Sequence, residues 1–242
     1  MNIGIRLTDL SVIIPVLNEF GNIDILTTRL ALLPIDGEYI FVDDGSTDGT
    51  RELLADLENK DKKFIAILNN ERLGHMGSYL SGLKLASSNH VVIMDGDLQH
   101  PPESLLGMLK LLDLGYDIVV GSRYHGRYFI GNRDKTRGII SRVAELLLKL
   151  FIKECRQLSD PVSGFVGFRK DIVIPITSNM NGNKLLPFLI VANKKAKVGH
   201  IPYRFQERQN GESKIVSGNT KFVRNFLIEV RDIRKIASQY RK

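Results

Sequence analysis

The sequence predicts an α/β protein with a mostly parallel β-sheet flanked by helices, followed by an amphipathic helix at the C-terminal end. Two observations lead to this prediction. Short apolar runs alternate with helix-length segments through the first 121 residues, a pattern typical of a parallel sheet covered on both faces. Polar clusters also follow three of the apolar runs, at the strand ends where such sheets bind ligands.

The first half of the chain supplies five predicted strands and four helices. The strands are expected at 10–16, 39–42, 64–68, 90–94 and 117–120, and the helices at about 19–33, 47–59, 77–87 and 103–114, with Thr47 capping the second helix. Beyond residue 121 we expect an amphipathic helix at 134–153, strand-like pieces near 163–168 and 197–205 with a helix between them, and a basic amphipathic helix at about 219–240. We therefore divide the chain into a main domain, 1–216, and a C-terminal basic amphipathic helix, 217–242.

Composition limits the class of protein. With 242 residues and 43% hydrophobic composition, the chain is large enough to bury the core of one large domain. A single cysteine, Cys155, excludes an internal disulfide framework and suits a reducing compartment. Because no apolar run approaches the roughly 18–20 residues that span a bilayer, we expect a protein that does not cross the membrane.

The net charge of +7 is unevenly distributed. Residues 121–156 contain nine Lys or Arg and three Asp or Glu, residues 204–242 contain ten and four, and the rest of the chain has a net charge of −5. Basic segments of this kind bind nucleic acid, anionic lipid or phosphorylated substrates, and an ordinary solvated surface is the alternative.

The segment VVIMDGDLQHPPE, residues 91–103, places oxygen ligands directly after an apolar strand. Hard divalent cations such as Mg²⁺ and Mn²⁺ take carboxylate and amide oxygens and share them with substrate phosphates. Asp95, Asp97 and Gln99 are therefore predicted to hold such a metal, and Gly96 allows close approach of a bulky ligand. The alternative is a turn whose aspartates cap the next helix.

A second acidic cluster, VDDGSTDGT at 42–50, follows another strand. It lacks the glycine spacing of a dinucleotide fingerprint and the lysine of a P-loop. A carboxylate at a strand end is also suited to the N–H edge of a base or to ribose hydroxyls. We expect Asp44 to contact a ligand in this way and Asp48 to cap the following helix.

Six segments together resemble the successive motifs of the inverting family-two glycosyltransferases, and most closely the dolichyl-phosphate mannose synthase-like, polyprenyl-phosphate branch. They are VIIPVLNE, VDDGSTDGT, MDGDLQHPPE, GSRY, SDPVSGFVGFRK and RFQERQNGESK, and they span about residues 10–214. The resemblance implies a Rossmann-like GT-A fold, a nucleotide-sugar donor and a Mg²⁺ or Mn²⁺ cofactor. The chain departs from the pattern at Leu17, where an aromatic residue is common, and at Pro187, where a glutamate is common.

The resemblance also implies roles for particular residues. The donor nucleotide would be held by Pro15, Glu19, Asp43, Asp44 and Asp95, and the metal by Asp95, Asp97 and Gln99. The acceptor phosphate would be held by Arg123, Arg137 and Ser141. The catalytic set would be Asp97 with Arg208 and Lys214, which cover the diphosphate, and with Asp160.

The chemistry of the acceptor decides whether a general base is needed. A phosphate oxygen is already anionic near neutral pH, so it needs only positive charge to position it, for which Arg is well suited. A sugar hydroxyl would require a base. Asp160 is the candidate for that base, and a turn residue before Pro161 is the alternative reading.

The expected function is inverting transfer of mannose or glucose from a GDP- or UDP-sugar to a polyprenyl or dolichyl phosphate. We expect a peripheral protein on the cytoplasmic face of a membrane, without nucleic acid, and leave open a membrane-embedded partner subunit. The main alternative is a soluble glycosyltransferase acting on a glycan or small molecule. A sugar-phosphate nucleotidyltransferase would need a Gly-rich basic signature near the N-terminus, and a non-enzymatic basic module would leave the acidic strand ends unexplained.

Overall fold

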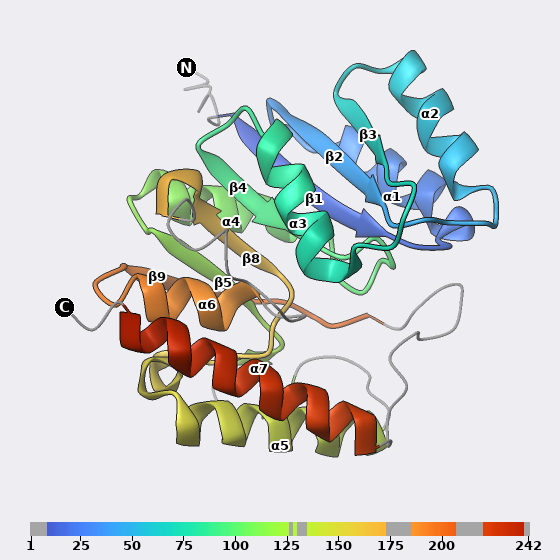
Figure 1. The fold of residues 1–242 in the computed structure, drawn as a ribbon. Coiled ribbons are helices and arrows are strands. Elements are labelled where there is room, and N and C mark those ends of the chain that lie inside the picture. Colours follow the sequence, from blue (N-terminus) through green and yellow to red (C-terminus); the bar gives the residue numbers. More distant parts are fainter. Residues whose placement is uncertain (1–8, 126–127, 130–134, 173–184, 207–219, 240–242) are drawn as a thin grey trace.

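The structure is a computed structural model that describes residues 9–125, 128–129, 135–172, 185–206 and 220–239. Helices cover both faces of a seven-stranded sheet (Figure 1). The elements up to the fifth strand are β1 (Leu10–Val16), α1 (Phe20–Ala31), β2 (Gly37–Asp43), α2 (Thr50–Lys60), β3 (Phe64–Leu68), α3 (Gly74–Leu85), β4 (His90–Ile93), α4 (Ser104–Asp113) and β5 (Ile118–Ser122). They are followed by β6 (Tyr124–His125), β7 (Tyr128–Phe129), α5 (Lys135–Phe151), the 3₁₀ helix η1 (Lys153–Gln157), β8 (Val166–Arg169), the 3₁₀ helix η2 (Lys170–Ile172), α6 (Leu185–Ala192), β9 (Val198–Pro202) and α7 (Thr220–Gln239).

The order and direction of the strands explain why most of the loops that follow them lie at one edge of the sheet. The order is β3-β2-β1-β4-β8-β5-β9, and β8 alone runs antiparallel to its neighbours, β4 and β5. The carboxyl ends of the six other strands therefore lie at one edge of the sheet, together with the start of β8. The chain reverses its direction of winding between β1 and β4, the position at which open α/β sheets bind ligands.

The central strands are mostly apolar because both faces of the sheet are buried there. Along β1, Ile13 packs in a core cluster with α3, α5, α6 and α7, whereas Val12 and Ile14 pack on the opposite face with α1, α2 and α4. The continuous apolar runs in the sequence thus reflect two cores that share one sheet, which confirms the predicted α/β fold.

Two predicted helix starts differ from the structure. The second helix starts at Thr50, and Asp48 rather than Thr47 binds its first residue: Asp48 Oδ1 accepts bonds from the Thr50 backbone N–H, 3.1 Å, and hydroxyl, 2.6 Å. The third helix starts at Gly74, three residues before the predicted Gly77, because its first N–H groups are bound by a carboxylate from another loop.

The C-terminal helix α7 packs against α5 and α6 (Figure 1). Its residues Val230, Ile233 and Ile236 are buried in the same cluster as α5 and α6. The Arg234 guanidinium carbon lies 6.0 Å from the centroid of the Phe151 ring at the end of α5. The predicted domain boundary at 216/217 lies outside the described residues. Among the helices that the structure describes, none is both long enough and apolar enough to cross a membrane.

Candidate functional site

A proline ends the pairing of two central strands at the binding edge of the sheet. Ile13 pairs with Ile93, and its carbonyl accepts a 3.1 Å hydrogen bond from the Met94 N–H. The pairing of β1 with β4 ends there, whereas β1 continues beside β2 to Val16. Residues i and i+2 of a strand turn their backbone groups to the same side, so Pro15 faces β4 without an N–H to donate. The hydrogen-bonded pairing of β1 with β4 therefore stops short of Pro15, at the edge where the polar loops meet.

The loop after β4 presents the carboxylates of Asp95 and Asp97 at this edge. The Asp95 side chain is 36% exposed, whereas Asp97 is only 4% exposed. Asp97 Oδ1 accepts a 3.1 Å hydrogen bond from the Gln99 N–H. Leu98, between Asp97 and Gln99, is fully buried and has φ +63°. This left-handed conformation costs on the order of 1 kcal/mol for a residue with a side chain. The buried Leu98 side chain thus anchors a tight turn.

These residues fit a hard divalent cation. A Cβ on Gly164 would lie 3.7 Å from Asp95 Oδ2 and 3.9 Å from Oδ1, so glycine at this position leaves the space beside the carboxylate open. In the described parts of the chain, no group of three or more His, Cys, Asp or Glu side chains is arranged to hold a metal. Two carboxylates with an amide nearby leave coordination positions for phosphate oxygens and water, as Mg²⁺ sites usually do.

Gln99 connects this turn to the segment after β9. Its side-chain Nε2 donates to the Gln206 carbonyl at 3.3 Å, and its own carbonyl accepts from the Gln206 N–H at 3.3 Å. The predicted residues Arg208 and Lys214 follow Gln206 and lie outside the described residues. The turn with the metal-ligand candidates is therefore bound to the segment that leads toward both predicted basic residues.

Asp43 shapes the loop after β2. Its side chain is fully buried and accepts hydrogen bonds from the Gly45 and Ser46 N–H groups at 3.1 Å, and from Arg51 Nη1 at 3.0 Å. These bonds use the carboxylate inside the protein. Asp43, which the sequence predicted to contact the donor, therefore shapes this loop from inside the protein.

Asp44 and Glu19 bring two more predicted carboxylates to the same edge. Asp44 accepts hydrogen bonds from the Leu73 N–H at 2.6 Å and the Gly74 N–H at 3.0 Å, at the start of α3. Glu19 accepts a 2.6 Å bond from the Asn22 amide. Both carboxylates are at least nine-tenths buried. Each oxygen of a carboxylate accepts more than one hydrogen bond, so both groups keep the capacity to bind a ligand.

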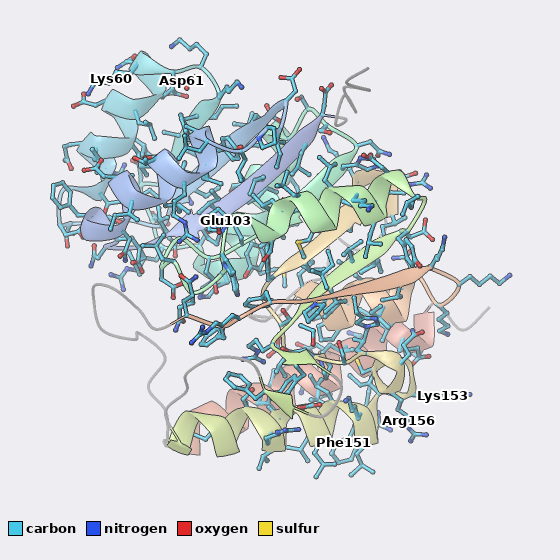
Figure 2. The ribbon with its side chains drawn as sticks, turned by 180° about the vertical axis from the view of Figure 1, so that it is seen from behind. Lys60, Asp61, Glu103, Phe151, Lys153 and Arg156 are labelled. Carbon is cyan, nitrogen blue, oxygen red and sulfur yellow. The ribbon has the colours of Figure 1, made fainter. Side chains whose placement is uncertain are left out.

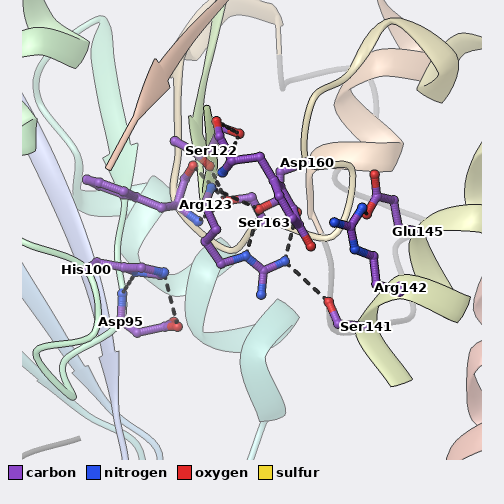
Figure 3. A network of polar contacts seen from close by, with 12 residues as sticks. Asp95, His100, Ser122, Arg123, Ser141, Arg142, Glu145, Asp160 and Ser163 are labelled. Carbon is purple, nitrogen blue, oxygen red and sulfur yellow. Dashed lines mark hydrogen bonds and ion pairs between the residues drawn. The ribbon is translucent and has the colours of Figure 1, made fainter. Parts of the chain in front are cut away.

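On the other side of the edge, Arg123 and Asp160 form a buried ion pair (Figure 3). Arg123 Nε donates to Asp160 Oδ2 at 2.7 Å and Nη2 donates to Oδ1 at 2.8 Å. Nη2 also lies 3.5 Å from the Ser141 hydroxyl on α5. Burial alone would lower the pKa of the Arg123 guanidinium, but its bonds to Asp160 raise that pKa above the ordinary value, so Arg123 is cationic.

The structure thus brings together two of the three residues predicted to hold the acceptor phosphate, Arg123 and Ser141. Arg137 belongs to α5 one helical turn before Ser141, on the same side of the helix, and its side chain is outside the described part. Asp160 is fully buried with both oxygens bound to Arg123. In this arrangement Asp160 orients Arg123.

The residues predicted to bind the donor and those predicted to bind the acceptor meet at the loop before β8. Asp160 binds Arg123, and Gly164, four residues later, lies beside the Asp95 carboxylate. No functional role was predicted for His100 from the sequence, yet its ring lies behind Asp95 in this junction. The only signal in the sequence was its position directly after Gln99.

Comparisons with known proteins identify the family of this chain. Residues 11–176 match the family model "Glycosyl transferase family 2". The chain is 36% identical to a dolichol-phosphate mannosyltransferase of Pyrococcus furiosus, over 88% of this chain and 60% of the relative, so it spans less than two thirds of that protein. It is 30% identical to a dolichol-phosphate mannosyltransferase of Saccharomyces cerevisiae, over 92% of this chain and 86% of the relative.

A more distant relative and a solved structure extend the comparison. An undecaprenyl-phosphate 4-deoxy-4-formamido-L-arabinose transferase of Yersinia enterocolitica is 28% identical over 86% of this chain and 63% of the relative. The crystal structure of Mycobacterium tuberculosis glucosyl-3-phosphoglycerate synthase with Mn²⁺, UDP and its product superposes with a TM-score of 0.68 at 19% identity, covering 95% of this chain and 80% of that one. This likeness confirms the predicted GT-A fold.

Proposed function

Because this chain belongs to glycosyl transferase family 2, we propose that it transfers a sugar, with inversion, from a nucleotide-sugar to a polyprenyl phosphate. The observation that carries the proposal is the meeting of two carboxylates and a buried cation at one sheet edge. Asp95 and Asp97 lie at the end of β4, and the Arg123–Asp160 pair is joined to them through the loop that contains Gly164.

The donor side is built from the loops after β1, β2 and β4. Glu19 and Asp44 bind the nucleoside part beside Pro15, and Asp95, Asp97 and Gln99 hold Mg²⁺ or Mn²⁺ against the diphosphate. When bound, the metal neutralises the negative charge that develops on the departing nucleoside diphosphate. Arg208 and Lys214 add positive charge to the same leaving group.

The acceptor side favours a phosphate over a hydroxyl. The acceptor oxygen attacks the anomeric carbon from the face opposite the leaving group, a new carbon–oxygen bond forms, and the bond to the nucleoside diphosphate breaks. A phosphate needs no base for this step, and Arg123, with Ser141 and Arg137, holds it in place. A hydroxyl would need Asp160 as base, which would remove one partner from a buried ion pair at a cost of about 3–5 kcal/mol.

The sugar is mannose or glucose in this proposal, from GDP or UDP. The names of the Pyrococcus and Saccharomyces relatives favour mannose, and the name of the Yersinia relative indicates that the wider family accepts other sugars.

A polyprenyl acceptor also requires that the protein contacts a membrane. We assign this contact to α5 and α7, which would lie on the cytoplasmic face of the membrane. The side chains of Val143, Leu146 and Leu150 on α5 are 51%, 67% and 61% exposed. Phe151 is the last residue of α5, and Lys153 and Arg156 follow it in η1, so apolar and basic groups share this region (Figure 2). An apolar stripe with adjacent cations suits an anionic interface. A membrane-embedded partner subunit would strengthen this contact.

Transfer assays test the proposal. Radiolabelled GDP-mannose and UDP-glucose are supplied with Mg²⁺ or Mn²⁺, each with a polyprenyl phosphate, with a glycan or with a small phosphorylated acid. We expect a lipid-extractable product from one donor that requires both the metal and the polyprenyl phosphate. Equal or faster transfer to either soluble acceptor would replace this proposal with the soluble glycosyltransferase, and failure with every donor would remove it.

A further inference from the structure

His100 is buried directly behind a carboxylate of the candidate metal site. Its side chain is 4% exposed. The backbone N–H of Asp95 donates a 2.9 Å hydrogen bond to His100 Nδ1 (Figure 3). A ring nitrogen that accepts a hydrogen bond carries no proton, so the neutral imidazole has its proton on Nε2. His100 thus presents an acceptor to the Asp95 backbone.

The other ring nitrogen faces the carboxylate of the same residue. His100 Nε2 lies 3.8 Å from Asp95 Oδ2, beyond hydrogen-bond distance but close enough for the N–H dipole to attract the carboxylate. One imidazole therefore acts on Asp95 twice, through the backbone N–H and through the side chain.

The ring itself is held by two aromatic neighbours from other elements. Phe165, just before β8, stacks on it with centroids 4.9 Å apart and planes 12° apart. Tyr203, just after β9, meets it edge-on at 5.6 Å and 86°. Phe165 and Tyr203 also pack edge to face at 5.4 Å. These contacts fix the ring plane, so both nitrogens keep their direction toward Asp95.

We propose that His100 is a positioning residue that holds Asp95 in the orientation needed to bind the divalent cation. This inference rests on the proposed function, which makes Asp95 a metal ligand. Groups that orient metal ligands commonly change metal affinity by 10- to 100-fold when they are removed. Here the orientation would come from a histidine that follows the metal motif in the chain and contacts the loops of the acceptor side.

Two substitutions at His100 distinguish the effect of its hydrogen-bond acceptor, Nδ1, from the effect of its aromatic ring. His100→Phe keeps an aromatic ring between Phe165 and Tyr203 but removes the acceptor. His100→Asn places its side-chain oxygen where Nδ1 lies, so it retains an acceptor for the Asp95 N–H. Affinity for Mn²⁺ in the presence of a nucleoside diphosphate is measured by calorimetry and by the EPR signal of free Mn²⁺, neither of which needs turnover.

We expect His100→Phe to bind Mn²⁺ about tenfold more weakly than the native protein, and His100→Asn to stay within about threefold of it. His100→Gln, whose amide reaches toward the Nε2 position instead, should behave like His100→Phe and replaces it if that variant does not fold. His90→Asn, at the opposite end of β4 beside Asp113, is the matched control and should bind normally.

Native affinity in a folded His100→Phe or His100→Gln would overturn the positioning role, as would equal losses in His100→Asn and His100→Phe. Failure of the proposed function appears differently, because the native protein itself would then bind no Mn²⁺ with any nucleoside diphosphate.

Discussion

The Tyr203 hydroxyl is buried and makes no hydrogen bond to the residues that the structure describes. Burial raises the pKa of Tyr203 well above its ordinary value, and nearby Arg123 lowers it only in part, so the phenol is neutral. An unsatisfied buried hydroxyl costs about 1–3 kcal/mol of stability. The hydroxyl of Tyr203 therefore does not stabilise the folded protein.

Tyr203→Phe should therefore raise the free energy of unfolding by about 1 kcal/mol, because the ring contacts stay and the unsatisfied hydroxyl is removed. Chemical denaturation measures the change. Tyr39→Phe is the matched control: its buried hydroxyl donates a 3.1 Å bond to the Leu30 carbonyl, so the same substitution should cost about 1 kcal/mol there. Equal destabilisation of both variants would contradict the assignment.

Asp97→Asn should lower sugar transfer at least ~100-fold and weaken binding of Mn²⁺ with nucleoside diphosphate, because a neutral amide is a poorer ligand for a hard cation. The fold should survive, since an amide oxygen still accepts the Gln99 N–H. Asp113→Asn, at the far end of the sheet, serves as the control. Full activity of Asp97→Asn, or of the native enzyme in excess chelator, would remove the metal assignment.

Cys155 should be inert in the folded protein. Its side chain is fully buried, and burial, aided by Glu154, raises the pKa of the thiol to about 12. Below its ordinary pKa near 9, the thiol is neutral in both states; as pH rises from there toward 12, only the unfolded chain ionises, and stability falls. At pH 8, a thiol reagent should label no cysteine in the native protein and one per chain in denaturant. Rapid native labelling would contradict this burial.

At the scale of elements, the sequence predicts strands and helices that have a local pattern of apolar residues. It does not predict features that depend on residues far apart in the chain. The apolar runs of β1 to β5 predicted most of the parallel strands, and the acidic segments after β2 and β4 predicted that Asp44, Asp95 and Asp97 lie at the same edge of the sheet. The direction of β8 was not predictable, because a short strand buried on both faces has no pattern that reveals its orientation. Likewise, only the fold joins Arg123 to Asp160, which lies 37 residues away.

We predict that α5 and α7, the helices at the base of Figure 1, bind to an anionic membrane surface. The Arg231 side chain is 74% exposed, and Arg234 is also exposed. Each arginine near an anionic surface contributes about 1 kcal/mol, so loss of both positive charges alone should weaken binding to anionic liposomes roughly 30-fold at low salt, and the repulsion of the two new glutamates should weaken it further.

Sedimentation of Arg231→Glu with Arg234→Glu measures this effect, and added salt should weaken binding of the native protein. Lys60→Glu with Lys62→Glu is the matched control, because α2 lies far from Phe151 (Figure 2). A native protein that stays in the supernatant at low salt, with or without polyprenyl phosphate, would rule out direct docking.

At the scale of the whole molecule, the two sides of the site belong to different stretches of chain. In the proposed site, the loops of residues 10–99 bind the donor and residues 123–141 bind the acceptor phosphate, while Arg208 and Lys214 come from later in the chain to the donor diphosphate. Changes on one side should therefore alter one substrate and spare the other.

Arg137→Ala should raise the acceptor KM or lower kcat by about tenfold, the effect of losing one charge-assisted phosphate contact, with donor affinity nearly unchanged. Steady-state kinetics with each substrate varied, together with donor binding by calorimetry, makes the comparison. Arg142→Ala, on the same helix and 54% exposed, is the control. If donor affinity falls as much as transfer, Arg137 belongs to the donor site or to the fold.

The strand β8 lies between β4 and β5 in the sheet but follows both of them in the chain, so the sheet cannot close in the order in which its strands are made. Its partners β4 and β5 are synthesised first, and each has an edge that only β8 will occupy. Unpaired apolar edges are where strands of other chains attach. After β5 has left the ribosome and until β8 has left it too, the nascent chain therefore displays a gap in its own sheet, and aggregation during synthesis should be concentrated in that interval.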